Sequence, residues 1–231
     1  MYVKENWEGS PYCVANEYIC GTIGRFLGLP IPPCDVLRLP GKRYAFAALD
    51  FNYDRERMPP VLPDLVVRHQ PLLSTGILLY DILIANNDRH DENLVTDNVS
   101  APRQILVFDH DQALFGGGGP VRGRERLETL QGRLGIGVAG GVTGGTGHCL
   151  LPYVTTAEHF GFWVDRIRGI PRWLFVDACG RAAETGIGKR DAARAAKFLY
   201  YRSRHLEDMI TSERNSFTSI TTWPKFGGLF P

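Results

Sequence analysis

Residues 79–115 read LYDILIANNDRHDENLVTDNVSAPRQILVFDHDQALF, and the fold is organised around this stretch. The apolar run at 77–84 has the composition of a buried helix, and it leads directly into the polar cluster NNDRHDEN at 86–93. After a loop, the apolar strand QILVF at 104–108 ends on the acidic triplet D-H-D at 109–111. We therefore expect a helix, a polar loop and a hairpin that bring two acidic clusters together.

Three polar positions in this stretch have the arrangement that metal-assisted phosphoryl transfer requires. Asp88 and Asn93 share one loop, and Asp109 follows the predicted hairpin. In this chemistry one carboxylate orients the attacking hydroxyl, while an amide oxygen and a second carboxylate hold Mg²⁺. A solvated turn would also account for 86–93, because Asn and Asp are common turn formers. It accounts less well for a second acidic cluster at the end of an apolar strand, so we favour a phosphoryl-transfer site.

The segment N-D-R-H-x-x-N, followed by a strand and D-H-D, resembles the catalytic and metal-binding loops of the HipA-like kinases. It is also similar to phosphoinositide kinases and other atypical kinases, which carry D-R-H-x-x-N. The resemblance implies that Asp88 is the catalytic aspartate and that Asn93 and Asp109 bind the metal. His90 is assigned a supporting role at the site. Asp111 is either a second metal ligand or a helix cap.

The N-terminal part of the chain extends the resemblance. A strand that carries Lys4 precedes a segment with apolar residues at helical spacing, 14–27, and the exit L-G-L-P-I-P-P. A strand lysine and a glutamate on the next helix can form an ion pair that directs the ammonium at nucleotide phosphates. Two solvated charges are the alternative. The start of the HipA-like domain is similar to this region, in which Y-V-K is followed by A-N-E-Y-I-C and then by the exit. The resemblance implies that Lys4 pairs with Glu17 and binds the nucleotide.

The fold that this resemblance implies is α+β, a protein-kinase-like two-lobe fold with a truncated N-terminal lobe. The small lobe, a strand, a helix and further strands, would span 1–50. A connector broken by prolines would occupy 51–75, and a mostly helical C-terminal lobe, 76–231, would carry the catalytic and metal loops. Kinases of this type cover the phosphates with a loop before the lysine strand, and three residues precede Lys4 here. Residues 5–12 are the candidate substitute.

Two glycine-rich tracts, 116–119 and 140–147, flank a segment with a short predicted helix at 124–134. Neither tract matches the phosphate-binding pattern G-x-x-x-x-G-K-[ST]. Because glycine this dense has high conformational entropy, we expect 116–147 to be a mobile segment beside the cleft. Further helices are expected at 157–167, 171–184 and 189–211.

Bulk composition narrows the class of protein. The 231 residues are 44% hydrophobic and 22% charged with a net charge of +1, so we expect no nucleic-acid partner. Five cysteines with no C-x-x-C favour reduced thiols over a disulfide framework or a zinc site. No apolar run approaches the roughly 18 residues that span a bilayer. With no secretory segment at the N-terminus, a cytoplasmic location is the expectation.

The predicted activity is transfer of the γ-phosphoryl group of ATP to a hydroxyl, with Mg²⁺ as the metal. The HipA-like resemblance implies Ser or Thr of a protein substrate, and we allow for a regulatory protein partner. Similarity to phosphoinositide kinases leaves a lipid or small-molecule hydroxyl as an alternative, although no basic run for anionic lipid is present. A pseudokinase that binds nucleotide or a partner without turnover is a third alternative. A hydrolase using Asp88 and His90 is disfavoured, because no Ser or Cys nucleophile lies in a recognisable elbow.

Overall fold

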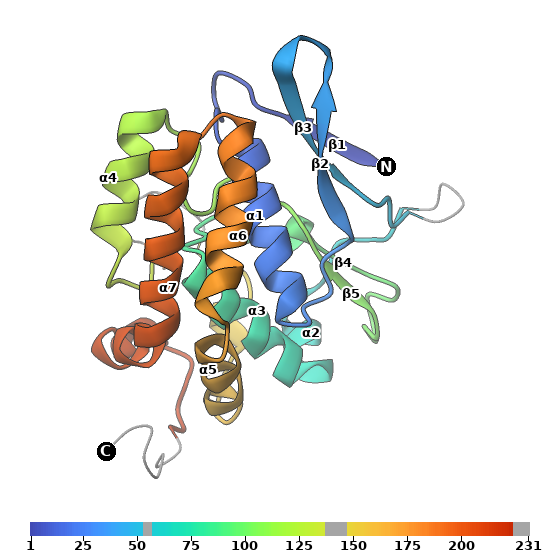
Figure 1. Ribbon diagram of the computed structural model, residues 1–231. Coiled ribbons are helices and arrows are strands. Elements are labelled where there is room, and N and C mark those ends of the chain that lie inside the picture. The colour runs from blue at the N-terminus through green and yellow to red at the C-terminus, as the bar shows by residue number, and fades with distance from the viewer. Residues whose placement is uncertain (53–56, 137–146, 224–231) are drawn as a thin grey trace.

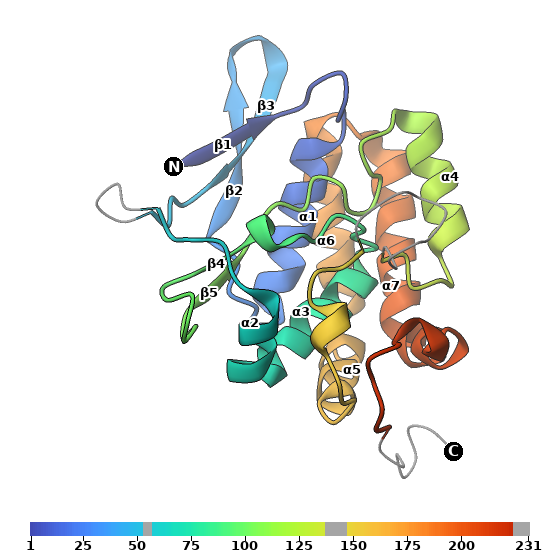
Figure 2. The ribbon, with the colours of Figure 1, turned by 180° about the vertical axis from the view of Figure 1, so that it is seen from behind.

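A small antiparallel sheet and a larger set of helices form a mixed α+β structure, which confirms the predicted class (Figure 1). The computed structural model describes residues 1–52, 57–136 and 147–223. Seen from behind, the sheet lies at one end of the molecule and the helices gather at the other (Figure 2).

The sheet has the strand order β1-β3-β2, and every neighbouring pair is antiparallel. Its strands are β1 (Tyr2–Glu5), β2 (Cys34–Leu39) and β3 (Arg43–Ala48). The turn between β2 and β3 places Gly41 at a φ of 75°, a left-handed conformation that glycine adopts without steric cost. Lys4 lies opposite Phe46 in the register of β1 and β3, so its position is fixed by the ladder.

Helix α1 (Cys13–Phe26) packs between the sheet and α6 (Arg172–Ala182). Most of its apolar residues are buried, as the spacing at 14–27 predicted, but Phe26 at its C-terminal end is 47% exposed. Asn16 and Glu17 are buried as well, and buried polar groups must find partners inside the protein. These two side chains therefore mark the face of α1 that meets the candidate site.

The prediction of irregular structure at 51–75 is wrong over its second half. Helix α2 (Pro63–His69) and the start of α3 (Pro71–Leu83) both lie there. Each helix has proline in its first turn, where the missing N–H would have no partner within the helix. The two prolines therefore start helices instead of breaking them. Tyr80 of α3 donates its hydroxyl hydrogen to the carbonyl oxygen of Cys20 over 2.6 Å, which joins α3 to α1.

The predicted hairpin is confirmed by the antiparallel pair β4 (Leu94–Thr96) and β5 (Ile105–Val107). The helix expected at 124–134 begins earlier, because Pro120 opens α4 (Pro120–Leu130). Within 116–147, residues 120–130 are therefore a regular helix, and most of the second glycine tract lies outside the described residues. The remaining helices, α5 (Phe160–Arg168), α6 and α7 (Gly188–Ser212), agree with the predicted ranges.

Two further expectations concern the whole chain. All five cysteines are free thiols, which agrees with the prediction of no disulfide framework. Among the described residues, no helix combines the length and the apolar composition needed to cross a membrane.

Candidate functional site

A cavity of about 490 Å³ lies between β3 and the β4–β5 hairpin. Its walls are mainly apolar, and its volume lies within the range typical of small-molecule sites. The side chains that form these walls include Ile31, Phe46, Ala48, Val95 and Phe108. Glu17, Asp109 and His110 lie close together and form a charged end of the lining, and Asp50, Asn52, Arg57 and Glu92 add further polar side chains elsewhere in it. The cavity therefore combines an apolar compartment with a charged end.

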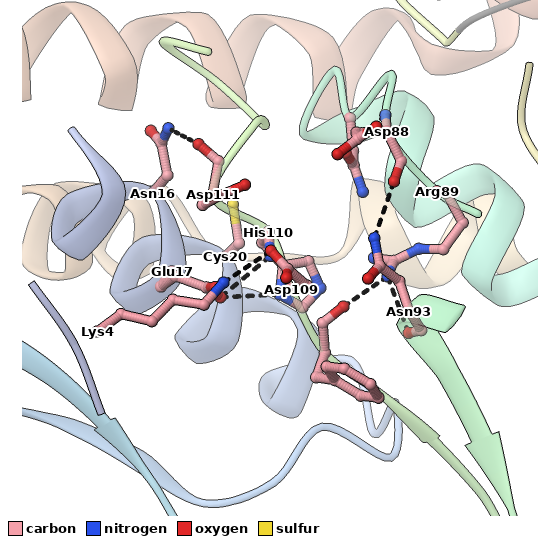
Figure 3. A network of polar contacts seen from close by, with 12 residues as sticks. Lys4, Asn16, Glu17, Cys20, Asp88, Arg89, Asn93, Asp109, His110 and Asp111 are labelled. Atoms are coloured by element: carbon pink, nitrogen blue, oxygen red, sulfur yellow. Dashed lines mark hydrogen bonds and ion pairs between the residues drawn. The ribbon is translucent and has the colours of Figure 1, made fainter. Parts of the chain in front are cut away.

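Lys4 is held between two carboxylates at this charged end (Figure 3). Its ammonium nitrogen lies 2.5 Å from Glu17 Oε1 and 2.7 Å from Asp109 Oδ1. The predicted ion pair of Lys4 with Glu17 is thus confirmed, whereas the contact with Asp109 was not predicted. Glu17 is 2% exposed, so its charge depends on these partners.

The electrostatic balance keeps this pair charged. Burial opposes the charge of Lys4, but the Glu17 and Asp109 carboxylates outweigh it and hold the pKa of Lys4 above its usual value. Burial likewise opposes ionisation of Glu17. The hydrogen bond from His110 and the charge of Lys4 reverse this effect and lower the pKa of Glu17 to about 2. Lys4 therefore carries its positive charge at neutral pH, directly beside Glu17 and Asp109 of the cavity lining.

The D-H-D segment is fixed to α1 by its backbone. The backbone N–H of His110 donates to Glu17 Oε2 over 3.1 Å, and the amide of Asn16 donates to the carbonyl oxygen of Asp111 over 2.6 Å. Burial and the neighbouring charge of Asp109 raise the pKa of the Asp111 carboxyl to about 6. Two acidic side chains are thus held close together, a situation that a bound cation would relieve.

Three non-glycine residues near the site have left-handed backbone conformations: Ala85 (φ 51°), Asp109 (φ 60°) and Leu114 (φ 45°). Asp tolerates this region better than Ala or Leu, and such residues persist only where their surroundings enforce them. Ala85 precedes the polar loop, whereas Asp109 and Leu114 delimit the segment after β5. Strain is therefore concentrated at the two loops that carry the predicted catalytic and metal-binding residues.

The polar loop presents Asp88 and Asn93 differently. The Asp88 side chain is exposed, while Asn93 is 4% exposed and donates from its amide nitrogen to the Asp88 carbonyl oxygen over 2.9 Å. Within the described part of the chain, no group donates a hydrogen bond to Asn93 Oδ1. The backbone N–H of Phe108 donates to the Asn93 carbonyl oxygen over 3.3 Å, which joins this loop to the strand that precedes Asp109. Figure 3 shows Asn93 and Asp88 on one side of Asp109, with Lys4 and Glu17 on the other.

His90 is half-buried and lies away from these contacts. Its ring nitrogen Nδ1 is 4.0 Å from the carboxylate of Glu92, which is itself exposed. A contact of this kind contributes little to stability. The backbone N–H of His90 donates to the Asp88 carbonyl oxygen, and the His90 carbonyl oxygen accepts from the Asn93 N–H, each over 3.1 Å. Among the described residues its ring makes no hydrogen bond to Asp88 or Asn93, so a supporting role for the side chain stays a prediction.

The polar loop rests on a buried network that the sequence analysis did not identify. The Arg89 guanidinium, fully buried, makes a two-pronged contact with the Asp81 carboxylate of α3, at 2.8 and 3.2 Å. Arg89 also donates to the Phe108 carbonyl oxygen over 2.6 Å. Asp81 accepts further hydrogen bonds from Asn86 at 2.9 Å and has His148 at 3.1 Å. This network holds the loop against both α3 and the end of β5.

The ionisation of Asp81 follows from this network. Burial disfavours the carboxylate, but the charge of Arg89 and the hydrogen bond from His148 hold its pKa well below the usual range. A carboxylate inside the apolar run at 77–84 was the signal in the sequence, because a charge buried among apolar residues needs a partner. No comparable signal marks His148.

Arg126 of α4 joins the two strained loops. Its Nη2 donates to the Ala85 carbonyl oxygen over 2.7 Å and to Asn87 Oδ1 over 3.0 Å, while its Nε donates to the Leu114 carbonyl oxygen over 3.1 Å. One guanidinium therefore binds the carbonyl oxygens of two of the three left-handed residues. This arrangement fixes the polar loop relative to the segment after β5.

The donor set fits Mg²⁺ bound together with a phosphate-bearing ligand. In the described ranges, no three His, Cys, Asp or Glu side chains gather closely enough to hold a metal on their own. Mg²⁺, however, is usually bound by one or two carboxylates together with water and substrate phosphates. The amide oxygen of Asn93 accepts no hydrogen bond from described residues, and only one oxygen of Asp109 accepts from Lys4. Hard oxygen donors thus remain available on both sides of the site.

No family model matches the chain, and no curated protein matches it. What the site can do chemically therefore follows from its geometry.

Proposed function

We propose that the protein is a kinase that transfers the γ-phosphoryl group of ATP to a hydroxyl, with Mg²⁺ as the metal. The observation that carries this proposal is the Lys4 ammonium, held between Glu17 and Asp109 at the charged end of an apolar cavity. A cation braced by a buried glutamate, beside a metal-binding aspartate, is the arrangement that binds nucleotide phosphates in kinases. In this reading residues 1–50 form a small lobe, and 76–231 form the larger, mostly helical lobe.

The nucleotide would lie with its base against the apolar walls and its phosphates at the charged end. Lys4 would contact the phosphate oxygens, and Asn93 and Asp109 would hold the metal, with Asp111 as a candidate second ligand. When bound, ATP would supply the phosphoryl group, and Mg²⁺ would neutralise the charge that develops during its transfer. The chain itself contributes mostly positioning and fixed charges, which is the main source of catalysis in this chemistry.

Asp88 is the residue proposed to orient the acceptor. Its carboxylate is exposed, and its backbone carbonyl is tied to Asn93, so the acceptor and metal positions are coupled within one loop. The buried contact of Arg89 with Asp81 keeps that loop in place. We propose Ser or Thr of a protein as the acceptor, because an exposed carboxylate can be approached by a macromolecular substrate. This proposal agrees with the resemblance to HipA-like kinases.

The test is incubation of the purified protein with γ-labelled ATP and Mg²⁺, with cell lysate as the pool of protein acceptors and lipid vesicles as a separate pool. Asp88→Asn is the matched control, since Asn keeps the shape of the exposed side chain. Label on a protein that is lost with Asp88→Asn would support the proposed kinase. Label found only in lipid would identify a lipid kinase instead.

The same preparation separates a pseudokinase from an enzyme. Tight, Mg²⁺-dependent ATP binding measured by calorimetry, without label transfer, would favour nucleotide binding without turnover. Absence of both binding and transfer would contradict the proposal.

A further inference from the structure

A second groove, of about 800 Å³, runs between α6 and α7. None of its lining residues belongs to the cavity described above. Ala192 and Ala196 of α7 form part of its floor, and Val176 and Gly180 of α6 form part of its wall. Small residues on two packed helices allow the backbone of a third helix to approach to the usual distance of about 8–10 Å. The shape of the groove therefore suits a helix.

The α6 side of the groove carries exposed apolar side chains. Val176, which lines the groove, is 54% exposed, and Trp173, one turn earlier on α6 and outside the groove lining, is 62% exposed, although residues of this size usually bury most of their surface. They follow each other at helical spacing, and Gly180 continues the same face of α6. An exposed tryptophan beside a groove is the kind of residue that anchors protein interfaces.

The rim of the groove carries positive charge without partners. Among the described residues, Arg172, Lys189 and Lys197 have no carboxylate within ion-pair distance, and Glu184 is the one acidic residue in the lining. The Arg172 guanidinium lies instead over the ring of Tyr200, 5.6 Å from its centroid. The cationic excess therefore belongs to the groove itself.

Two arginines just outside the groove provide the contrast. Arg181 lies 3.2 Å from Asp177, and Arg194 lies 2.9 Å from Asp191. These cations are neutralised within their own helices, whereas those on the rim are not. Cations that the chain leaves unpaired around an apolar groove are complementary to carboxylates of a partner.

We propose that the α6–α7 groove is a docking site for an acidic amphipathic helix of a partner protein. The apolar face of that helix would lie on Ala192 and Ala196 beside Trp173, in the helix-in-groove mode of recognition. Its Asp or Glu residues would flank the apolar face and meet Arg172 and Lys197. This inference is independent of the proposed kinase activity, because the two sites share no residue.

The experiment uses the full chain and a fluorescent helical peptide of about 18 residues, long enough to be helical in solution. The peptide carries Leu and Ala on one face and Glu on both flanks, and a second peptide has Lys in place of every Glu. We expect the acidic peptide to bind saturably in fluorescence anisotropy, with a Kd below about 100 µM that rises with salt. The Lys peptide should not bind.

Three variants test where the peptide binds. A Cβ added at Gly180 meets no atom within 4 Å, so Gly180→Tyr places a ring in the groove without a clash and favours the helix. This variant should weaken binding at least about tenfold, because the added ring occupies the space that the peptide helix would fill. Lys197→Glu should weaken it as well. Arg190→Glu makes the same charge change on α7 outside the groove lining and should bind like the wild type.

Three outcomes would overturn the proposal. The first is failure of the acidic peptide to bind, and the second is equal binding of the Lys peptide. The third is a dimer in light scattering that Gly180→Tyr dissociates, because the groove would then receive a second copy of this chain.

Discussion

The ammonium nitrogen of Lys4 lies 2.7 Å from Oδ1 of Asp109, although 105 positions separate the two residues in the chain. The same ammonium pairs with Glu17, so one cation serves a buried and a partly buried carboxylate. Contacts between residues so distant in sequence form only when the sheet, α1 and the β4–β5 hairpin have assembled. The charged end of the cavity therefore depends on the fold as a whole.

Lys4→Met should destabilise the protein by about 3–5 kcal/mol, because it leaves the buried Glu17 carboxylate without its cation. The double variant Lys4→Met/Glu17→Gln should recover much of this loss, since the amide carries no charge and can still accept the N–H of His110. Urea unfolding of the single and double variants measures the coupling free energy. Additive effects of the two substitutions would show that the pair is not energetically coupled.

The pH dependence of stability should report the ionisation of Glu17. Its pKa in the folded protein is about 2, below the ordinary value of 4.5, so the folded state binds this proton less readily than the unfolded state. The stabilisation is complete above about pH 4.5 and is lost as the pH falls toward 2. The wild type should lose on the order of 3 kcal/mol relative to Glu17→Gln across this window. A difference in unfolding free energy that stays constant from pH 5 to 2 would contradict the assignment.

Asp109→Asn should reduce Mg²⁺-dependent ATP affinity at least about tenfold, as expected when a metal ligand is altered. Asparagine tolerates the left-handed conformation of this position, so the backbone should be preserved. Calorimetry with Mg²⁺ and with EDTA separates the metal effect from nucleotide binding itself. Asp111→Asn in the same assay distinguishes a second metal ligand, which would reproduce the loss, from a cap, which would not. Unchanged affinity in Asp109→Asn would refute the proposed metal site.

Asp81→Asn should cost about 3–5 kcal/mol, because the fully buried Arg89 would lose its counter-charge. The unfolding free energy from urea titration measures this loss. Asp208→Asn is a suitable control, since Asp208 is 77% exposed and exposed ion pairs contribute at most about 1 kcal/mol. Equal effects of the two substitutions would mean that the buried network does not support the polar loop.

Arg126→Met should loosen the polar loop, because the carbonyl oxygens of Ala85 and Leu114 lose their shared donor. Each buried carbonyl left without a donor should lower the unfolding free energy by about 1–3 kcal/mol. Hydrogen exchange at 85–93 should become faster, and this measurement does not require any catalytic activity. Arg126→Lys keeps the charge but not the planar fork, so we expect an intermediate effect. Unchanged exchange in both variants would show that Arg126 only anchors α4.

Local sequence patterns predicted the elements of the fold well. Helical spacing at 14–27 identified α1, and the apolar strand before D-H-D identified the β4–β5 hairpin. The prediction at Pro63 and Pro71 was wrong because proline is found both after the end of a helix and in the first turn of a helix. Only the preceding and following apolar pattern distinguishes these cases, and near residue 63 that pattern is short.

The candidate site could be predicted only in part. The pairing of Lys4 with Glu17 was inferred from a resemblance, whereas the contact of Lys4 with Asp109 depends on how the sheet lies over the hairpin. His148 reaches Asp81 across 67 positions, and Arg126 lies on a helix with no motif. Such contacts cannot be predicted from sequence periodicity, because periodicity indicates only which face of a helix or strand is buried.

The position of β1 at the edge of the three-stranded sheet has a consequence for how the site is lost. This strand has four residues, pairs with β3 alone among the described strands and leaves most of its side chains exposed, whereas α1 is buried on nearly every side. Edge segments of this kind detach at a lower free energy than the helical core. Fraying of β1 would withdraw the Lys4 ammonium while the rest of the molecule stays folded. Whether Lys4 stays in the site therefore depends on a short strand and two ion pairs. A melting temperature, which measures unfolding of the whole molecule, would not detect the loss of Lys4 from the site.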